Sequence, residues 1–157
     1  MTSIPRLRPV AAAVVTVGIA AAMHASAGYG QVSAGRYEVQ PETVRELKTH
    51  LTWQRAVAAN KVSFTAAGQL CADLVLGGRD DWRMPSMQEL QTIVDDGRAR
   101  PAIDPVAFPG TPAEDFWTAT PWAETPLLAW HVDFATGTAA YERVSVLYWA
   151  RCVRWDP

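Results

Sequence analysis

Proline interrupts the second half of this 157-residue chain, because six of its eleven prolines lie between Pro101 and Pro126. Proline fixes its own φ angle and has no N–H to donate, so neither a long helix nor a central strand can run through such a stretch. We expect an ordered, extended loop here, with residues 116–120 as the one strand within it. The helices must therefore lie outside this region.

The first 27 residues have the composition of a secretory signal. Arg6 and Arg8 precede residues 10–22, an uninterrupted run of apolar and small residues, and residues 25–27 (ASA) supply a cleavage site. At 13 residues the run is shorter than the about 20 that a transmembrane helix needs, and no cysteine lies directly after it to carry a lipid anchor. We predict cleavage after Ala27 and an exported protein, periplasmic or extracellular, without a stable membrane anchor. A buried, alanine-rich helix is the alternative.

A flexible leader over residues 28–35 and a single domain over residues 36–157 would follow the signal. Without Arg6 and Arg8 the chain keeps 12 basic and 16 acidic residues, a net charge of −4, and it has no run of basic residues. This balance argues against a nucleic-acid partner, whose phosphates require a basic surface. The whole chain is 49% hydrophobic and 19% charged, which is ordinary for a globular domain.

Two cysteines, Cys71 and Cys152, stand 81 positions apart. In an exported protein such a pair predicts one disulfide bond. The bridge would close most of the domain and stabilise it by roughly 4–5 kcal/mol in the chain-entropy model. Two unpaired, buried thiols are the alternative.

Two helices are predicted between residues 63 and 97. In residues 63–76 the apolar side chains recur at three- and four-residue steps after Ser63, a candidate N-cap, and Gly77-Gly78 would end the helix. That spacing directs Cys71 into the core. The second helix begins with a capping box, Ser86 to Glu89, and residues 95–97 (DDG) end it. Pro85 and Leu90 occupy the hydrophobic-staple positions on either side of the capping box. Met87, Leu90 and Ile93 or Val94 form the apolar face of the helix.

Strands are predicted on both sides of the helices. Residues 37–39, 44–46 and 51–55 precede them. After the proline-rich stretch, Leu128, Trp130, Val132 and Phe134 alternate with smaller or polar residues, and a hairpin turn at 136–137 leads to residues 139–143. Residues 148–154 close the chain. The order of strands, two helices, loop and strands predicts an α+β domain.

Six segments then follow one another in a familiar order: 43–55 (TVRELKTHLTWQR), 76–90 (LGGRDDWRMPSMQEL), 102–109 (AIDPVAFP), 116–120 (FWTAT), 129–134 (AWHVDF) and 146–154 (VLYWARCVR). Together they resemble the Lcl C-terminal domain family, a bacterial domain of largely unknown function found in secreted, surface and lipoprotein contexts. The resemblance implies a C-type-lectin-like fold, related to that of formylglycine-generating enzymes. Its two helices would pack on short antiparallel strands beside a long proline-rich loop and one disulfide. The founding member is a collagen-like adhesin whose C-terminal domain binds sulfated glycans and trimerises.

Two departures from the family pattern matter. His50 stands where the family usually has glycine, so a positive φ there would carry a small conformational cost. The acidic net charge also argues against a sulfated glycan as the ligand.

Most tryptophans are predicted to be structural. Trp53, Trp117 and Trp130 match strand positions of the family motifs, and Trp82 immediately precedes the capped second helix; all four are assigned to the core. Arg83 is expected to form an internal ion pair with Asp81 or Asp80.

Trp122 differs, because it lies in a loop bounded by Pro121 and Pro126 with no strand periodicity to bury it. An exposed indole on a stiff loop offers a surface on which a sugar ring can stack. Tyr141, Arg143 and Tyr148 follow in the next strand and loop and can line the same face. In the alternative, Trp122 folds back onto the core.

Metal binding and catalysis find little support. Calcium takes six to eight oxygen ligands, yet Asn60 is the one Asn, and the acidic pairs 95–96 and 114–115 are more typical of solvated loops. His50 and His131 have no zinc-ligand spacing around them. His131 and Asp133 share one side of a strand, which more often means a surface hydrogen bond than a base and its orienting group. We expect no metal and no cofactor.

These observations favour an exported, non-catalytic binding module that recognises a glycan or a partner protein on a cell surface. The second hypothesis is a structural subunit of an envelope assembly, in which exposed aromatics form an interface between copies and no small ligand binds. An enzyme related to the formylglycine-generating fold comes third, because that chemistry depends on extra cysteines that this chain lacks.

Overall fold

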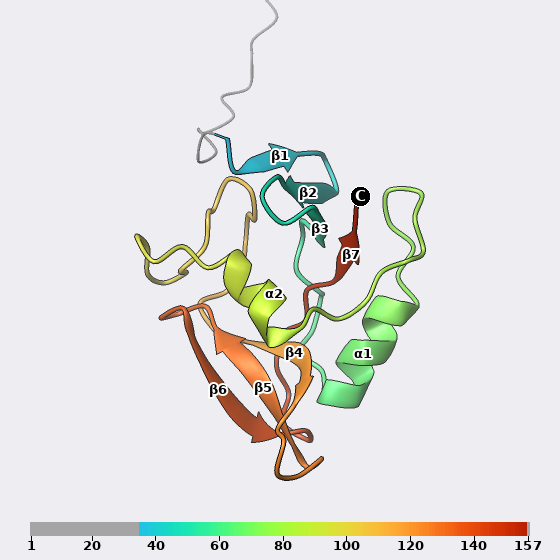
Figure 1. Cartoon of the computed structure of the whole chain (residues 1–157), viewed down its shortest axis with the longest axis vertical. Coiled ribbons are helices and arrows are strands. Elements are labelled where there is room, and N and C mark those ends of the chain that lie inside the picture. The colour runs from blue at the N-terminus through green and yellow to red at the C-terminus, as the bar shows by residue number, and fades with distance from the viewer. Residues whose placement is uncertain (1–34, 157) are drawn as a thin grey trace, which may run out of the picture.

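Two small antiparallel sheets and two short helices make up residues 35–156, the part of the chain that the computed structural model describes (Figure 1). One sheet has four strands in the order β1-β2-β3-β7, and the other has three in the order β4-β5-β6. The elements, in chain order, are β1 (Tyr37–Val39), β2 (Thr43–Glu46), β3 (Leu51–Gln54), α1 (Phe64–Ala72), α2 (Met87–Thr92), β4 (Asp115–Pro121), β5 (Leu128–Asp133), β6 (Thr138–Arg143) and β7 (Val153–Trp155). The predicted α+β class is confirmed.

The four-stranded sheet joins the two ends of the domain. Strand β7 pairs with β3, so that Trp53 lies opposite Val153, and both side chains are fully buried. His50, in the turn before β3, has a φ of 56°. Glycine, which the family usually has at this position, adopts a positive φ at a lower conformational cost than histidine does.

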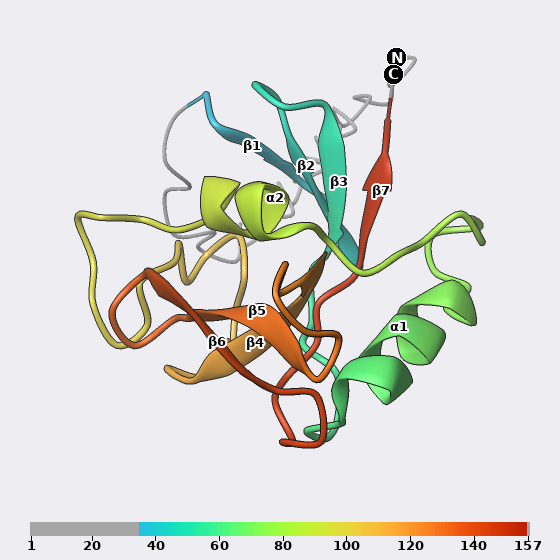
Figure 2. The same ribbon diagram turned by 60° about the horizontal axis from the view of Figure 1, so that its bottom comes forward.

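The three-stranded sheet is covered on both faces near its centre. On one face Phe116 and Val132 pack with Leu90 of α2, and on the other Trp117 and Ala129 pack with Cys71 of α1. Figure 2 shows α2 above this sheet and α1 beside it. The predicted alternating strand is present as β5, and because this sheet lies between two cores, residues on both of its faces are buried, Ala129 and His131 on one and Val132 on the other.

The helices begin where the sequence predicts and end earlier. Ser63 caps α1 by accepting from the Ala66 N–H, but the helix ends at Ala72, with Asp73 as its C-cap. The expected glycine stop instead forms a turn farther on, where Gly77 and Gly78 both have positive φ.

The start of α2 carries the predicted capping box, with both reciprocal bonds between Ser86 and Glu89 in place. The helix ends at Thr92, before residues 95–97. Leu90 and Ile93 are fully buried, whereas Val94 and Met87 are half-buried.

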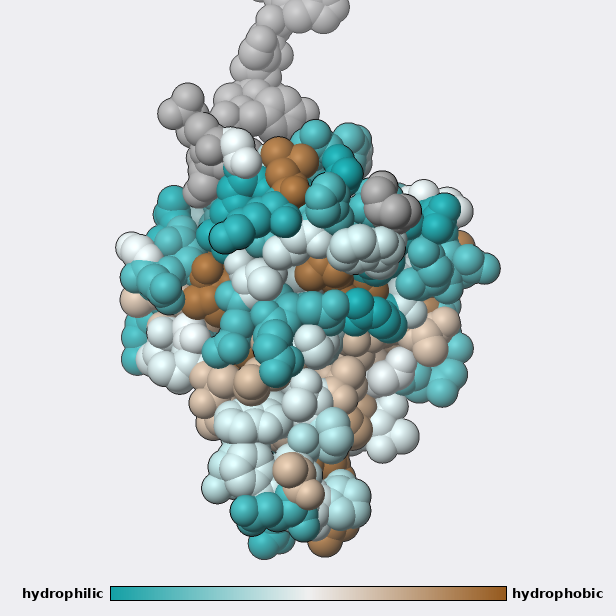
Figure 3. Space-filling model, in the orientation of Figure 1, coloured by the Kyte–Doolittle hydropathy of each residue, from teal (hydrophilic) through white to brown (hydrophobic). Residues whose placement is uncertain are grey.

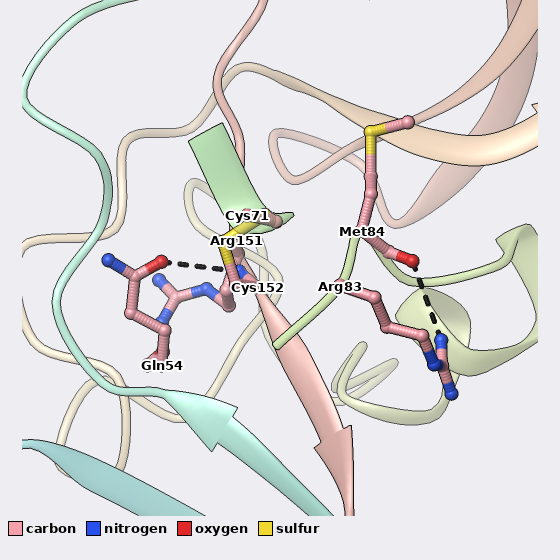
Figure 4. Close-up of a disulfide and its surroundings, with 6 residues drawn as sticks. All are labelled: Gln54, Cys71, Arg83, Met84, Arg151 and Cys152. Atoms are coloured by element: carbon pink, nitrogen blue, oxygen red, sulfur yellow. Dashed lines mark hydrogen bonds between the residues drawn. A yellow bond between two sulfur atoms is a disulfide. The ribbon is translucent and has the colours of Figure 1, made fainter. Parts of the chain in front are cut away.

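A disulfide joins Cys71 of α1 to Cys152, as predicted, with the two Cα atoms 5.3 Å apart (Figure 4). The Cys152 N–H donates to the side-chain oxygen of Gln54 at 3.2 Å. Strand β7 begins only at Val153, so the last strand is shorter than the predicted 148–154. Before it, Tyr148 forms an isolated bridge with Val62, outside either sheet.

Arg151 ties the proline-rich stretch to the rest of the domain, and the sequence did not single it out. Its side chain is fully buried and donates to the carbonyl oxygens of Gln54 and Arg55 and to Thr111 Oγ1, each at 2.7 Å. The guanidinium carbon lies 4.8 Å from the centre of the Phe108 ring. Burial lowers the pKa of Arg151 to about 9, so the buried group stays charged at neutral pH.

The predicted signal, residues 1–27, lies outside the described residues, as does the leader apart from Gly35. Within residues 35–156, no helix has the length and apolar character required to cross a membrane.

Candidate functional site

Three aromatic side chains gather at one end of the three-stranded sheet: Trp122, Trp130 and Tyr141. We call them the aromatic cluster. The Trp122 ring stacks on Tyr141, with centroids 4.0 Å apart and an interplanar angle of 27°. Trp130 lies 5.2 Å from Trp122 and meets Tyr141 edge-on at 5.7 Å.

Strand register and a fixed loop position these rings. Trp130 of β5 lies directly opposite Tyr141 of β6, so the two side chains project from the same face of the sheet. The register of β4 shifts between Trp117 and Pro121, and the Trp122 N–H then donates to the Leu128 carbonyl at 2.9 Å. These two features bring Trp122 over the same face.

Trp130 corrects one expectation, because it is half-buried and not part of the core. Its ring belongs to the aromatic cluster, whereas Trp53 and Trp117 are fully buried and Trp82 is nearly so, as predicted. Val132, on the same face of β5, belongs to the core cluster that contains Leu90 of α2, whereas Trp130 lies outside that cluster.

Tyr148 corrects another expectation, because it lies away from the aromatic cluster. Its ring centre is 4.8 Å from that of Trp117 and 4.7 Å from that of His131, on the opposite face of the sheet. Arg143 lies opposite Leu128, two residues beyond Tyr141, and so shares the face of the cluster. Of the four predicted ligand-binding residues, the structure thus groups Trp122, Tyr141 and Arg143 on one face.

The cluster is open to solvent on its outer side. Tyr141 is 47% exposed, and Leu127, in the Trp122 loop, is 67% exposed. In Figure 3 the lower half of the molecule is mostly pale, from light teal through white to pale brown, with teal again at its lowest end, whereas the upper half is mostly teal with small brown patches. A stacked aromatic surface of this kind can contact the apolar face of a sugar ring or of a partner side chain.

His131 is paired with a different residue from the one expected. The strand spacing suggested Asp133, but His131 Nδ1 lies 3.0 Å from Asp115 Oδ1, without the alignment of a hydrogen bond. His131 is 7% exposed, so it is not a surface residue. Burial raises the pKa of the Asp115 carboxyl above its ordinary value, and the nearby His131 opposes that rise. In residues 35–156 no group of three or more His, Cys, Asp or Glu side chains is placed to hold a metal ion.

Arg83 also has another partner than the predicted Asp81 or Asp80. Its two terminal nitrogens donate to the two carboxylate oxygens of Glu89, at 2.6 and 2.8 Å. This bidentate pair holds the pKa of Glu89 below its ordinary value, and the same carboxylate closes the capping box of α2. Asp81 instead accepts hydrogen bonds from Arg79 and Arg154.

Comparison with known families matches residues 42–154 to the model of the Lcl C-terminal domain. The chain belongs to the Lcl C-terminal domain family. The matched region of this Lcl C-terminal domain contains the entire aromatic cluster, Arg83 and both disulfide cysteines. Comparison with curated proteins gives no match.

Proposed function

We propose that this Lcl C-terminal domain is an exported, non-catalytic module that binds a neutral or lightly charged glycan through the aromatic cluster. The observation that carries the proposal is the stack of Trp122 on Tyr141, half-exposed at the open end of a sheet. Aromatic rings provide a large contact area at low conformational-entropy cost, which suits them to recognition. Export is supported by the composition of residues 1–27, and the C-type-lectin-like arrangement by the resemblance of the motif segments.

The charge distribution favours a neutral ligand over a polyanion. Salt bridges tie many of the arginines to acidic side chains, including Arg36 to Glu46, Arg83 to Glu89 and Arg98 to Asp95. Arg151 is buried and bonded to carbonyl oxygens. Few arginines are thus available to release counterions from a sulfated chain.

A glycan array probed with the wild-type protein, with Tyr141→Ala and with Trp155→Ala tests this proposal. Trp155 is the matched control, because it is 54% exposed but lies on β7, in the other sheet. We expect binding to a neutral glycan that Tyr141→Ala loses and Trp155→Ala retains. Equal loss of glycan binding in both variants, or no glycan bound by the wild type, would count against the aromatic cluster as a sugar-binding surface.

Exposed apolar residues support a second candidate, a structural subunit without a small ligand. Leu127 is 67% exposed beside the cluster, and an interface between copies would cover it. Mass measurement over a dilution series separates the two candidates. An oligomer that dissociates in Leu127→Ser favours the subunit, whereas a monomer at every concentration favours the glycan module.

A further inference from the structure

A polar cleft of about 420 Å³ lies far from the aromatic cluster, between the four-stranded sheet and the turn that follows α1. In Figure 1 that turn rises beside β7. Arg45, Thr52 and Arg154 line it from the sheet, Arg79 lines it from the turn, and Asp156 lies just beyond β7. Three guanidinium groups from distant positions in the sequence therefore meet in one concave site.

One carboxylate in this region is firmly held. Asp81 accepts two hydrogen bonds from Arg79, at 2.9 and 3.1 Å, and a third from Arg154 Nε at 2.9 Å. Two of these three distances, both 2.9 Å, lie within the about 2.7–2.9 Å expected of charge-assisted bonds. Asp81 therefore fixes the positions of Arg79 and Arg154.

A second carboxylate, that of Asp156, is held loosely in the cleft. Its oxygens lie 3.4 Å from Arg45 Nε and 3.4 Å from an Arg154 terminal nitrogen, and Thr52 Oγ1 donates to it at 3.1 Å. Both ion-pair distances exceed the about 2.7–2.9 Å of strong charge-assisted bonds. Among the described residues nothing accepts a hydrogen bond from Arg45 Nε, although that atom is buried.

We propose that this cleft binds the carboxylate of a hexuronic acid unit, which takes the place of the Asp156 carboxylate. Arg45, Arg154 and Thr52 already surround a carboxylate there and can donate to another one. The Asp156 N–H donates to the His50 carbonyl at 2.9 Å, so rotation of the Asp156 side chain vacates the position without moving the backbone. The Asp156 carboxylate thus occupies, in the ligand-free protein, the position that the ligand carboxylate would take.

The remaining lining suits a sugar better than a peptide C-terminus. Glu38, Gln40 and Thr43 also line the cleft and can bond to ring hydroxyls, since each carries an acceptor oxygen. Apolar lining is limited to Leu76 and Trp82, and the Trp82 indole N–H is already bonded to backbone carbonyls. A peptide that ends in an apolar residue would find little apolar surface here for its last side chain. The volume falls within the range of small-molecule sites, which is about 300–1,000 Å³.

Charge balance limits the ligand to one negative charge in the cleft. Arg45, Arg79 and Arg154 face the carboxylates of Glu38, Asp81 and Asp156. When Asp156 turns away, one positive charge is left unmatched, and a single uronate carboxylate matches it. This site is separate from the aromatic cluster, so either proposal can fail while the other stands.

The probe is D-glucuronate, titrated into the isotope-labelled protein while the backbone amide signals of the cleft are followed by NMR. We expect saturable shifts in the wild type and about tenfold tighter binding in Asp156→Asn, because that substitution weakens the internal competitor. Arg45→Gln is expected to weaken binding by about tenfold, since it removes a charged donor to the carboxylate. Arg98→Gln, at an arginine paired with Asp95 outside the cleft, is the matched control and should leave the affinity unchanged.

Three further probes make the test specific. Glucose tests the hydroxyls alone, acetate tests the carboxylate alone, and a short peptide with a free C-terminus tests the competing ligand. We expect glucose to give no saturable shift and acetate to bind more weakly than glucuronate. The proposal is overturned if glucuronate shifts no cleft signal even in Asp156→Asn, or if glucose or the peptide binds as well as glucuronate. An unchanged affinity in a folded Arg45→Gln variant would overturn it as well.

Discussion

Tryptophan has two different roles at the two ends of the three-stranded sheet. Next to the disulfide, Trp117 is fully buried, and its indole N–H donates to the Val62 carbonyl at 3.0 Å. At the open end, Trp122 has ring neighbours, Tyr141 and Trp130, and is half-buried. Trp117 is enclosed by α1 and by the segment around Cys152. Trp122, in contrast, is covered mainly by the rings of Tyr141 and Trp130.

This difference shows how one residue type serves stability in one region and recognition in another. Where a helix and a covalent bridge lie over the sheet, an indole loses its contact with water and becomes part of the core. Where the strands extend past α2, the rings can only cover part of each other, and apolar surface stays exposed. We therefore expect substitutions to cost much stability in the disulfide region and little in the aromatic cluster.

Removal of the disulfide should have the largest effect on the disulfide region. The double variant Cys71→Ala, Cys152→Ala is expected to lose about 4.5 kcal/mol of unfolding free energy, because the bridge closes a loop of 81 positions. Urea unfolding followed by circular dichroism measures the loss. A decrease smaller than about 1 kcal/mol would mean that the bridge does not hold this region together.

Trp117→Ala should come next, with a loss of about 4 kcal/mol, because it removes a fully buried aromatic ring from the core. Chemical unfolding against the wild type measures it. Trp155→Ala is the control, since Trp155 is 54% exposed and its loss should stay within about 0.5 kcal/mol. Similar losses in both variants would remove the distinction between buried and exposed tryptophans.

Glu89→Gln tests helix α2, which lies between the disulfide region and the aromatic cluster. The start of this helix, where Glu89 closes the capping box, contacts β4, because the Met87 N–H donates to Thr120 Oγ1 at 3.0 Å. We expect a loss of about 1 kcal/mol at pH 7 from the weakened capping box and ion pair. The pKa of Glu89 is lowered in the folded state, so its contribution is complete above about pH 4.5 and is lost as the pH falls through the folded-state pKa. Unfolding of both proteins at pH 7 and pH 3 should therefore show the difference shrinking at low pH. Glu124→Gln, at an exposed loop residue, should show no such difference at either pH.

Trp122→Ala should cost only about 1 kcal/mol, because its ring is half-buried and rests on other side chains. The measurement is the same chemical unfolding used for Trp117→Ala. A loss equal to that of Trp117→Ala would show that the aromatic cluster is a second core and would sharpen the case for a structural role.

The smallest effect is expected for sulfated polymers. The arginines paired with acidic residues leave little free positive charge, so heparin should retain the protein weakly or not at all at physiological salt. Elution from a heparin column above about 0.3 M salt would contradict this expectation, because exposed charges are strongly screened there. Such a result would show that basic side chains, such as those of the cleft around Asp156, contribute to recognition of a polyanion.

The sequence by itself determined the features that depend on near neighbours. The capping box at Ser86, the N-cap at Ser63 and the hairpin at Gly137 each need only a few consecutive residues, and each is present. The disulfide followed from the cysteine count, because two cysteines allow one pairing. The α+β class followed from the order of such local signals, and the family from motifs along most of the chain.

Only the tertiary structure decided which distant residues meet. Arg83 pairs with Glu89 and not with Asp81, since its side chain extends toward the start of α2, a direction that sequence proximity does not specify. Tyr148 and Tyr141 lie on opposite faces of the sheet because the segment after β6 crosses to the side of Trp117. The packing of sheets and helices also decides three other features. These are the burial of side chains on both faces of the three-stranded sheet, the buried position of Arg151, and the cleft around Asp156. Periodicity within one strand identifies its two faces, but the neighbours packed on each face determine which side chains remain exposed.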